Sequence, residues 1–313
     1  MPMQTADPRA WRAETIDAPD AWYLSLSEPA LGALDRVVRG WDGSTPVTDL
    51  RAPDDLRAAA AEDAAKALAA LERGRGFVVV TAGPPGRYSP RELTAAYWLV
   101  GQLLGRPFEQ NVQGTLLYDV RDTGQDVRYG ARFSVTNAES TFHTDNSFGD
   151  QILDYVGLLC LNDAKSGGLS QMVSAYAVET ELRAEDPAAW AVLRRPFHVD
   201  RRGGLRPGDA PTARFPVFGT DGPDLLVRYL RYWIEVGHEK AGEPLTPEQT
   251  AALDALDRIA GEPRLRVEFA LRPGEMLFAN NRWLLHNRTA FEDHPEPDRR
   301  RHLVRLWLQR ADR

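Results

Sequence analysis

The sequence predicts an α+β fold that is mainly β and is built around a β-barrel or sandwich. Three observations support this class. Helical patterns lie near the N-terminus, many short strand patterns separated by polar turns follow them, and one helical segment interrupts the strands. The 313 residues suffice to bury a large core. We expect a single domain over residues 1–313, with an N-terminal extension over 1–75 and an insertion over 198–260.

The N-terminal elements are indicated by composition and by capping residues. Alanine-rich residues 54–73 predict a helix, and the β-branched run 76–80 predicts a buried strand. Ser89 and Glu92 form the pattern of a capping box, which predicts a helix that ends at Gly105. The first 50 residues contain three tryptophans, which a disordered tail rarely carries, so we expect this stretch to pack on the core: Trp11, Trp22 and Trp41.

The rest of the chain is mostly short strands. Six strands are expected, over residues 116–120, 132–136, 153–161, 264–271, 276–280 and 302–309. Residues 198–245 are rich in Gly, Pro, Asp and Arg, which is typical of a long insertion. Thr246 is the expected N-cap of a helix that ends near Gly261.

Composition excludes several classes of protein. The net charge of −7 and the pI near 5.5 argue against general nucleic-acid binding, which needs a basic face. No apolar run is long enough to span a membrane, and the first residues show no signal-peptide pattern. Cys160 is the only cysteine, which fits a reducing compartment. We therefore expect a cytoplasmic protein with no nucleic-acid or membrane partner.

Two histidines and an aspartate suggest a metal site. His143 and Asp145 are two residues apart, so on an extended chain they point to the same side, and His286 supplies a third donor. Two histidines and one carboxylate with three open positions match the facial triad of non-haem Fe(II) oxygenases. A catalytic zinc uses similar ligands, so a zinc-dependent hydrolase is the alternative. The other four histidines are expected at the surface: His198, His238, His294 and His302.

The last predicted strand has two faces of different character. One face is largely apolar: His302, Val304, Leu306 and Leu308. The other carries Arg301, Leu303, Arg305 and Trp307. If this second face lines a barrel interior, Arg301 and Arg305 each need an anionic partner, because a buried unpaired charge is strongly unfavourable. The alternative is a solvated edge strand whose arginines extend into water.

Together these residues resemble the taurine dioxygenase family of Fe(II)/2-oxoglutarate-dependent oxygenases, with its clavaminate synthase-like amino-acid hydroxylases. The resemblance runs from about residue 76 to 310. It rests on four groups of residues in this order: 142–147 (FHTDNS), 167–170 (GGLS), Asn281 and Arg282 with His286 and Arg288, and Arg301, Leu303, Arg305 and Trp307. It implies a double-stranded β-helix, or jelly roll, with flanking helices.

The resemblance also implies roles for single residues. His143, Asp145 and His286 would bind Fe(II). Arg301 would bind the distal carboxylate of 2-oxoglutarate, helped by the hydroxyl of Ser170, where the family usually has threonine. With O₂ at the last site, 2-oxoglutarate would become succinate and CO₂, and a substrate C–H bond would be oxidised, most often to an alcohol.

The substrate implied is a small carboxylate, preferably a free amino acid or a natural-product intermediate. Arg305 would bind its acid group, as in several relatives. Asn137 and Glu139 lie where relatives line the substrate pocket and could bind an ammonium group, and Asn146 is close to the metal ligands in sequence. The insertion is expected to form a lid that excludes water. A catalytically silent jelly-roll binding module is the remaining alternative.

Overall fold

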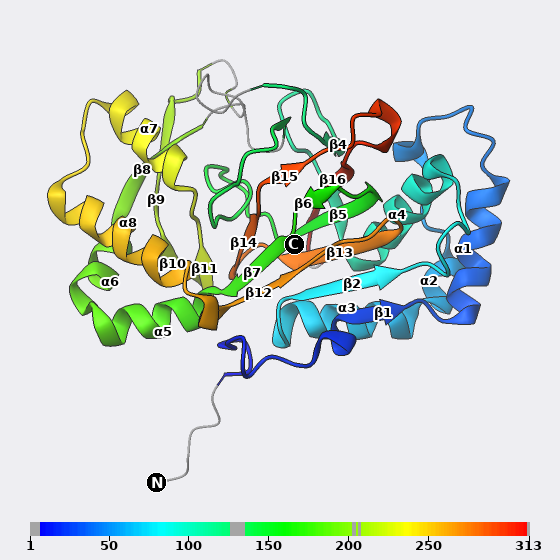
Figure 1. Ribbon diagram of the computed structural model, residues 1–313, viewed down its shortest axis with the longest axis horizontal. Helices are drawn as coiled ribbons and strands as arrows, with labels where there is room; N and C mark the ends of the chain where they lie inside the picture. Colours follow the sequence, from blue (N-terminus) through cyan, green and yellow to red (C-terminus); the bar gives the residue numbers. More distant parts are fainter. Residues whose placement is uncertain (1–6, 126–134, 202–204, 206–207, 312–313) are drawn as a thin grey trace, which may run out of the picture.

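The computed structural model describes residues 7–125, 135–201, 205 and 208–311. Two β-sheets lie at its centre, and helices cover them on both sides (Figure 1). Strands make the core and helices the outer layers, so the predicted α+β class with a β core is confirmed.

The larger sheet contains seven strands. They are β1 (Tyr23–Ser25), β2 (Phe77–Thr81), β3 (Arg106–Phe108), β4 (Leu117–Val120), β5 (Tyr155–Asn162), β13 (Glu275–Asn280) and β16 (His302–Gln309). Their order is β1-β2-β13-β5-β16-β3, and β4 also pairs with β16. Only the β1–β2 pair among these contacts is parallel.

The smaller sheet has the order β12-β7-β14 and is antiparallel. Its strands are β7 (Ser170–Ser174), β12 (Arg266–Phe269) and β14 (Leu284–Arg288). The remaining strands form three two-stranded antiparallel pairs: β6 (Ser166–Gly167) with β15 (Phe291–Glu292), β8 (Pro196–Asp200) with β9 (Thr212–Pro216), and β10 (Phe218–Asp221) with β11 (Asp224–Val227).

The helices form two groups at opposite ends of the view in Figure 1. The first group packs on the larger sheet: α1 (Glu28–Gly40), α2 (Asp54–Ala59), α3 (Ala61–Arg73) and α4 (Pro90–Leu104). The second group packs on the smaller sheet and on the hairpins β8–β9 and β10–β11. It consists of α5 (Ala175–Glu185), α6 (Pro187–Leu193), α7 (Arg231–Ala241) and α8 (Pro247–Ala260). Short 3₁₀ turns occupy Pro19–Trp22, Val47–Asp49, Pro263–Leu265 and Pro297–Arg299.

Alternate residues of the last strand, β16, pack into two different buried clusters, as the two faces of its sequence predict. Val304, Leu306 and Leu308 belong to the buried cluster under α1–α4. Leu303 and Trp307 point the other way, into the cluster between the two sheets. β16 therefore supplies one apolar face to the outer helices and one mixed face to the interior of the sheet pair.

Several predicted elements are confirmed, and some differ in detail. The capping boxes at Ser89 and at Thr246 are both present. The helix expected over 54–73 is broken at Ala60, which is the C-cap of α2 and the N-cap of α3. Of the strand expected over 132–136, residues 132–134 lie outside the described residues, and 135–136 are not in a strand.

The segment 198–245 was expected to be a long insertion, and its described part holds the hairpins β8–β9 and β10–β11 and the helix α7. Within it, the prediction that His198 and His238 lie at the surface is wrong, because both are buried. The Nδ1–H of His238 donates to the carbonyl of Glu243 at 2.7 Å, and its Nε2 accepts the backbone N–H of His198 at 3.2 Å. The second of these bonds joins α7 to β8.

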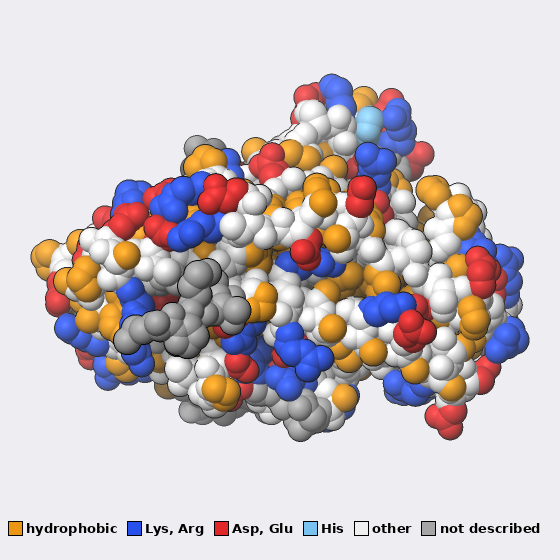
Figure 2. All heavy atoms as spheres, turned by 90° about the horizontal axis from the view of Figure 1, so that it is seen from below, with side chains coloured by type: hydrophobic (Ala, Val, Ile, Leu, Met, Phe, Trp, Pro, Cys, Tyr) orange, Lys and Arg blue, Asp and Glu red, His pale blue; other side chains and the backbone are white. Residues whose placement is uncertain are grey.

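Two findings concern the surface. Lys and Arg side chains are interspersed with Asp and Glu on the face shown in Figure 2, which is unlike the single basic surface that nucleic-acid-binding proteins present. Among the described residues, no helix combines the length and the apolar character needed to cross a membrane.

Candidate metal centre and active site

His143 and His286 come from two chain segments that are hydrogen-bonded to each other. His286 lies on β14, and His143 lies in the loop that precedes β5. Each backbone N–H donates to the other residue's carbonyl at 3.0 Å, which forms an isolated antiparallel bridge. Residues opposite each other in such a bridge project to the same side, so the two imidazoles share one space. Their ring centres are 4.3 Å apart.

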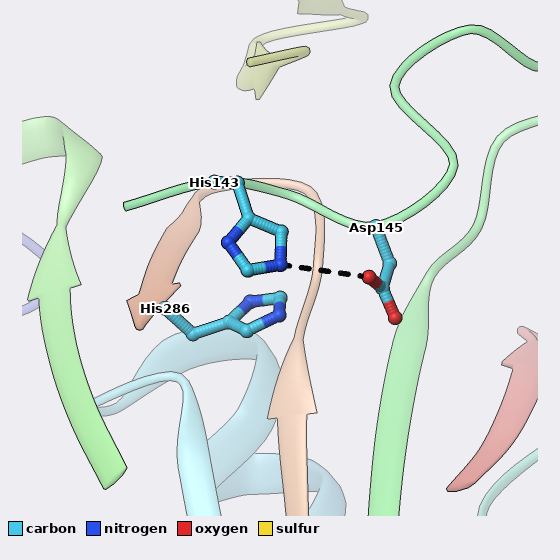
Figure 3. Close-up of side chains that lie close together, drawn as sticks. All are labelled: His143, Asp145 and His286. Carbon is cyan, nitrogen blue, oxygen red and sulfur yellow. Dashed lines mark ion pairs between the residues drawn. The ribbon is translucent and has the colours of Figure 1, made fainter. Parts of the chain in front are cut away.

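Asp145 completes a cluster of three metal-binding groups. Nε2 of His143 is 3.7 Å from Oδ1 of Asp145, and one ligand atom from each of the three side chains lies within 4.8 Å of the others. Figure 3 shows both rings and the carboxylate directed at a common space. Two imidazole nitrogens and a carboxylate are the donor set that non-haem Fe(II) takes on one face, with three positions left open.

Both histidines are held in the neutral form that binds a metal. The Nδ1–H of His143 donates to the carbonyl of Thr141 at 2.6 Å, which leaves the lone pair on Nε2. Burial lowers the pKa of His143. Burial and the neighbouring His143 lower the pKa of His286 to about 3. Near pH 7, neither ring therefore has to lose a proton before it binds a metal.

Among the described residues, hydrogen bonds reach one oxygen of the Asp145 carboxylate, Oδ2. Oδ2 accepts the indole N–H of Trp307 at 2.8 Å and Nη1 of Arg305 at 3.1 Å. Burial is the largest single influence and raises the pKa of Asp145, but Arg305, the two histidines and Trp307 together lower the pKa to about 2. The backbone of Asp145 is also fixed, because Asn281 accepts its N–H at 2.8 Å and donates to its carbonyl at 2.9 Å.

Arg305 forms an ion pair with the carboxylate of Asp145. Arg305 also forms two hydrogen bonds with Gln110. Nε of its guanidinium donates to Oε1 of Gln110 at 2.8 Å, and Nε2 of Gln110 donates to the backbone carbonyl of Arg305 at 2.9 Å. The sequence suggested that Arg301 and Arg305 would each need a separate anion if they faced inward. For Arg305, the metal ligand Asp145 is already that anion.

Arg301 is buried, and among the described residues its guanidinium forms no ion pair, although its backbone N–H donates to Oδ1 of Asp293 at 2.7 Å. Only 5% of its surface is exposed, and its Nη1 has no hydrogen-bond acceptor among the described residues. Its guanidinium lies 5.1 Å from the ring centre of Phe291, and a Cβ added at Gly168 would lie 3.2 Å from its Nε. A guanidinium held this way, with an unused donor, is suited to bind a carboxylate such as the distal one of 2-oxoglutarate.

Arg288 and Ser170 are neighbours across the smaller sheet. The two residues are paired in the β7–β14 register, and Ser170 is buried but does not border the cavity of the metal cluster. Arg288 does border it, and its guanidinium donates to the carbonyls of Thr136, at 3.0 Å, and Ala138. Burial and the charge of Arg301 lower the pKa of Arg288 to about 10.

One cavity is lined by the three residues of the metal cluster, by Asn146, and by three arginines: Arg288, Arg301 and Arg305. Its other walls are largely apolar and include Phe148, Leu230, Tyr232, Trp233, Leu303 and Trp307. Asn146 has a positive φ of 52°, a conformation that asparagine tolerates better than most residues, directly after Asp145. Asn137 and Glu139 are exposed and do not border this cavity.

Sequence reasoning did not assign roles to Gln110, Asn281 and Arg288. Asn281 and Arg288 belong to the quoted resemblance, but nothing in the local pattern shows that Asn281 fixes Asp145. Gln110 lies in a segment with no pattern at all. Only the tertiary contacts reveal these roles.

The fold and the site together define a jelly-roll oxygenase that uses Fe(II) and 2-oxoglutarate. The donor set suits Fe(II), and the unused donor of Arg301 suits the co-substrate. The chain belongs to the taurine catabolism dioxygenase TauD, TfdA family, whose model matches residues 44–307. It is therefore an Fe(II)- and 2-oxoglutarate-dependent dioxygenase, with O₂ as the oxidant.

Relatives and solved structures agree with this class. FR-33289 synthase of Streptomyces rubellomurinus is 29% identical over 311 residues, which cover 95% of this chain and 88% of the relative. Uridine-5'-phosphate dioxygenase of an Amycolatopsis species is 34% identical over 202 residues, which cover 62% of this chain and 69% of the relative.

The solved structures show the fold. Asparagine oxygenase in complex with Fe(II), 2S,3S-3-hydroxyasparagine and succinate superposes with a TM-score of 0.67 at 19% identity and covers 93% of this chain and 94% of that chain. The non-heme iron oxygenase OrfP in complex with Fe and alpha-ketoglutaric acid has a TM-score of 0.62 at 18% identity, with coverage of 92% and 94%. The jelly-roll fold implied by the sequence resemblance is confirmed.

Proposed function

We propose that this dioxygenase hydroxylates a C–H bond of a small organic acid, such as an amino acid or another natural-product intermediate. One observation carries the proposal: the His143, Asp145 and His286 cluster and the buried, unpaired Arg301 border the same cavity. The names of the relatives support a small-molecule substrate, since they include FR-33289 and uridine-5'-phosphate, and solved neighbours hold hydroxylated asparagine and arginine.

The residues of the chain have distinct tasks in this reaction. Bound Fe(II), with 2-oxoglutarate and O₂, supplies the oxidation that releases succinate and CO₂. The three ligands would hold the metal, and Arg301 would hold the distal carboxylate of the co-substrate, without Ser170, which does not border the cavity. Arg305 would stand between Asp145 and the substrate, next to Asn146. The insertion over 198–260 supplies Leu230, Tyr232 and Trp233 to the cavity wall, and we propose that it excludes water during the reaction.

The proposal is tested by succinate release from 2-oxoglutarate in the presence of Fe(II), ascorbate and a panel of small acids. We expect oxygen-dependent succinate formation that at least one acid stimulates. His143→Ala should abolish iron binding and turnover, while His294→Ala, outside the site, should leave both intact. Turnover without oxygen would support the zinc hydrolase instead.

Arg301 and Arg305 can be separated by their effects on two different ligands. We expect Arg301→Ala to raise the KM for 2-oxoglutarate by one to two decades, since a charged hydrogen bond contributes about 1.5–3 kcal/mol. Arg305→Ala should mainly weaken metal binding, because it removes the partner of Asp145. Arg300→Ala, an exposed neighbour on the same segment, is the matched control. The reverse pattern would mean that the two roles are exchanged.

A further inference from the structure

The residue between two of the metal ligands is held by the insertion. Thr144 lies between His143 and Asp145, and 1% of its surface is exposed. Its backbone N–H donates to the carbonyl of Tyr229 at 2.8 Å. Its hydroxyl accepts the backbone N–H of Tyr229 at 3.1 Å and donates to the carbonyl of Val227 at 3.3 Å. Three hydrogen bonds therefore join this one residue to the connection between β11 and α7.

Residues 227–229, which we call the linking segment, also hold the turn beside the metal ligands. The backbone N–H of Val227 donates to the carbonyl of Arg282 at 2.6 Å. Arg282 directly follows Asn281, whose side chain fixes the backbone of Asp145. The linking segment thus lies between the loop that carries two ligands and the turn that fixes one of them.

The linking segment is anchored on its outer side by α8. The hydroxyl of Tyr229, a fully buried residue, donates to Oδ1 of Asp257. Arg231, at the start of α7, forms ion pairs with Asp254 at 2.9 Å and with Asp257 at 3.1 Å. Because the linking segment is fixed to a helix of the outer layer, it can support the metal-binding loop from behind.

The linking segment leads directly into the wall of the cavity. Leu230, Tyr232 and Trp233 follow it in the chain and border the same cavity as Thr144 and the metal ligands. Any displacement of the linking segment therefore moves the wall and the metal-binding loop together. Thr144 is the point at which the two parts of the site meet.

We propose that Thr144 is a positioning residue of the oxygenase, which makes the order of the metal ligands and the order of the cavity wall depend on each other. A metal ion that binds the ordered loop then stabilises the linking segment and the wall behind it. By linkage, a linking segment that is held in place raises the affinity for the metal by the same factor. Nothing in this role depends on which acid is the substrate.

Metal affinity tests the role of the Thr144 hydroxyl. Thr144→Val keeps the shape of the side chain but leaves the buried N–H of Tyr229 without this acceptor. Under anaerobic conditions and well below the melting temperature, we expect Co(II) to bind Thr144→Val about 5-fold more weakly than the wild type, the factor that one neutral hydrogen bond contributes to an equilibrium. Thr144→Ser, which keeps the hydroxyl, should recover the affinity. Thr94→Val in α4 is the matched control, because it removes a hydroxyl that donates to the carbonyl of Pro90 at 2.9 Å. An unchanged affinity in Thr144→Val would overturn the proposal.

Loosening the outer anchor tests the same path from the other side. Tyr229→Phe removes the bond to Asp257 and leaves every backbone bond of the linking segment in place. We expect it to weaken Co(II) binding about 2- to 5-fold, although its side chain contacts no metal ligand. Tyr155→Phe is the matched control, because it removes a buried phenol that donates to Glu72. In the double variant with Thr144→Val, the loss should be smaller than the product of the two single losses, since both act through one contact. No effect of Tyr229→Phe, or fully multiplicative losses, would contradict this path.

Hydrogen exchange in the wild type decides even if a variant does not fold. Saturating Co(II) should slow amide exchange in peptides that cover residues 143–145 and also in those that cover 227–233, because a ligand suppresses every opening that breaks its site. Exchange in residues 90–104 of α4 should stay the same. Slower exchange over 143–145 alone would overturn the proposal. These measurements use Co(II) and no substrate, so their outcome is independent of the substrate proposed above.

Discussion

The two oxygens of the Asp145 carboxylate have different surroundings, and this difference prepares the residue as a single-oxygen metal ligand. Oδ2 receives hydrogen bonds from Trp307 and Arg305, while Oδ1 faces Nε2 of His143. Hydrogen bonds to the outer oxygen of a ligating carboxylate fix its rotation and keep it ionised. Trp307 is therefore a positioning residue, which acts on the metal through Asp145.

We predict that Trp307→Phe lowers the affinity for Fe(II) roughly 10-fold, because it removes the indole N–H and keeps the aromatic ring that stacks on Phe108. Co(II) titration under anaerobic conditions measures this affinity without turnover. Trp41→Phe is the matched control, since it also removes an indole donor, but one that bonds to the carbonyl of Thr45. An unchanged metal affinity in Trp307→Phe would show that Arg305 alone fixes the carboxylate.

At the residue scale, the sequence predicts the ligands but not what holds them. His143 and Asp145 are recognisable because they are two positions apart, and Arg301 and Arg305 because they alternate on one strand. Their supports are distant in the chain: Asn281 lies 136 positions from Asp145, Trp307 lies 162 positions from it, and Gln110 lies 195 positions from Arg305. No local pattern encodes pairs at such separations, so they are visible only after folding.

At the scale of elements, α7 connects the insertion to the active site. Leu230, Tyr232 and Trp233, at its start, border the cavity. In its middle, Gly237 lies directly on the backbone of β8, where an added Cβ would be 2.6 Å from the carbonyl oxygen of His198 and 2.7 Å from the amide nitrogen of Asp200. Backbone atoms cannot rotate away as a side chain can, so the helix itself would have to move.

We predict that Gly237→Ala destabilises the protein by about 1–3 kcal/mol, although alanine is the better helix former by about 1 kcal/mol. Urea unfolding measures the difference. Gly32→Ala in α1 is the matched control, because an added Cβ there meets no atom within 4 Å, and it should be neutral or stabilising. We also expect weaker substrate stimulation in Gly237→Ala, since α7 carries part of the cavity wall. Stability equal to the wild type would contradict the close α7–β8 contact.

The elements that the sequence predicts are those with strong local signals. Capping boxes predict α4 and α8, and β-branched or alternating runs predict β2 and β16. The helix α7 was missed because no side-chain cap precedes it. The hairpins β8–β9 and β10–β11 were missed because their sequence is rich in turn residues, and their pairing depends on the helices that cover them.

At the scale of the whole molecule, an acidic protein encloses a basic cavity. The net charge is −7, yet three arginines and one aspartate border the cavity among the described residues. The charge of the site is therefore set locally, by which side chains the two sheets direct inward, and bulk composition gives no indication of it. The backbone bridge between His143 and His286 involves no metal ion, so we expect the scaffold to form the site before any metal binds.

This preformed site leads to a prediction for metal removal. The bridge between His143 and His286 and the bonds between Asn281 and Asp145 need no ion, so the chelated protein should keep its far-UV circular dichroism and a cooperative thermal transition. Stability should fall only by the linkage term, about 2.7 kcal/mol when the free metal concentration is 100 times its Kd. The measurement is a pair of thermal melts, with a chelator and with Co(II). His143→Ala should melt at the same temperature in both conditions. Loss of secondary structure on chelation would show instead that the metal organises the two sheets, and that the backbone bridge between residues 143 and 286 forms only around it.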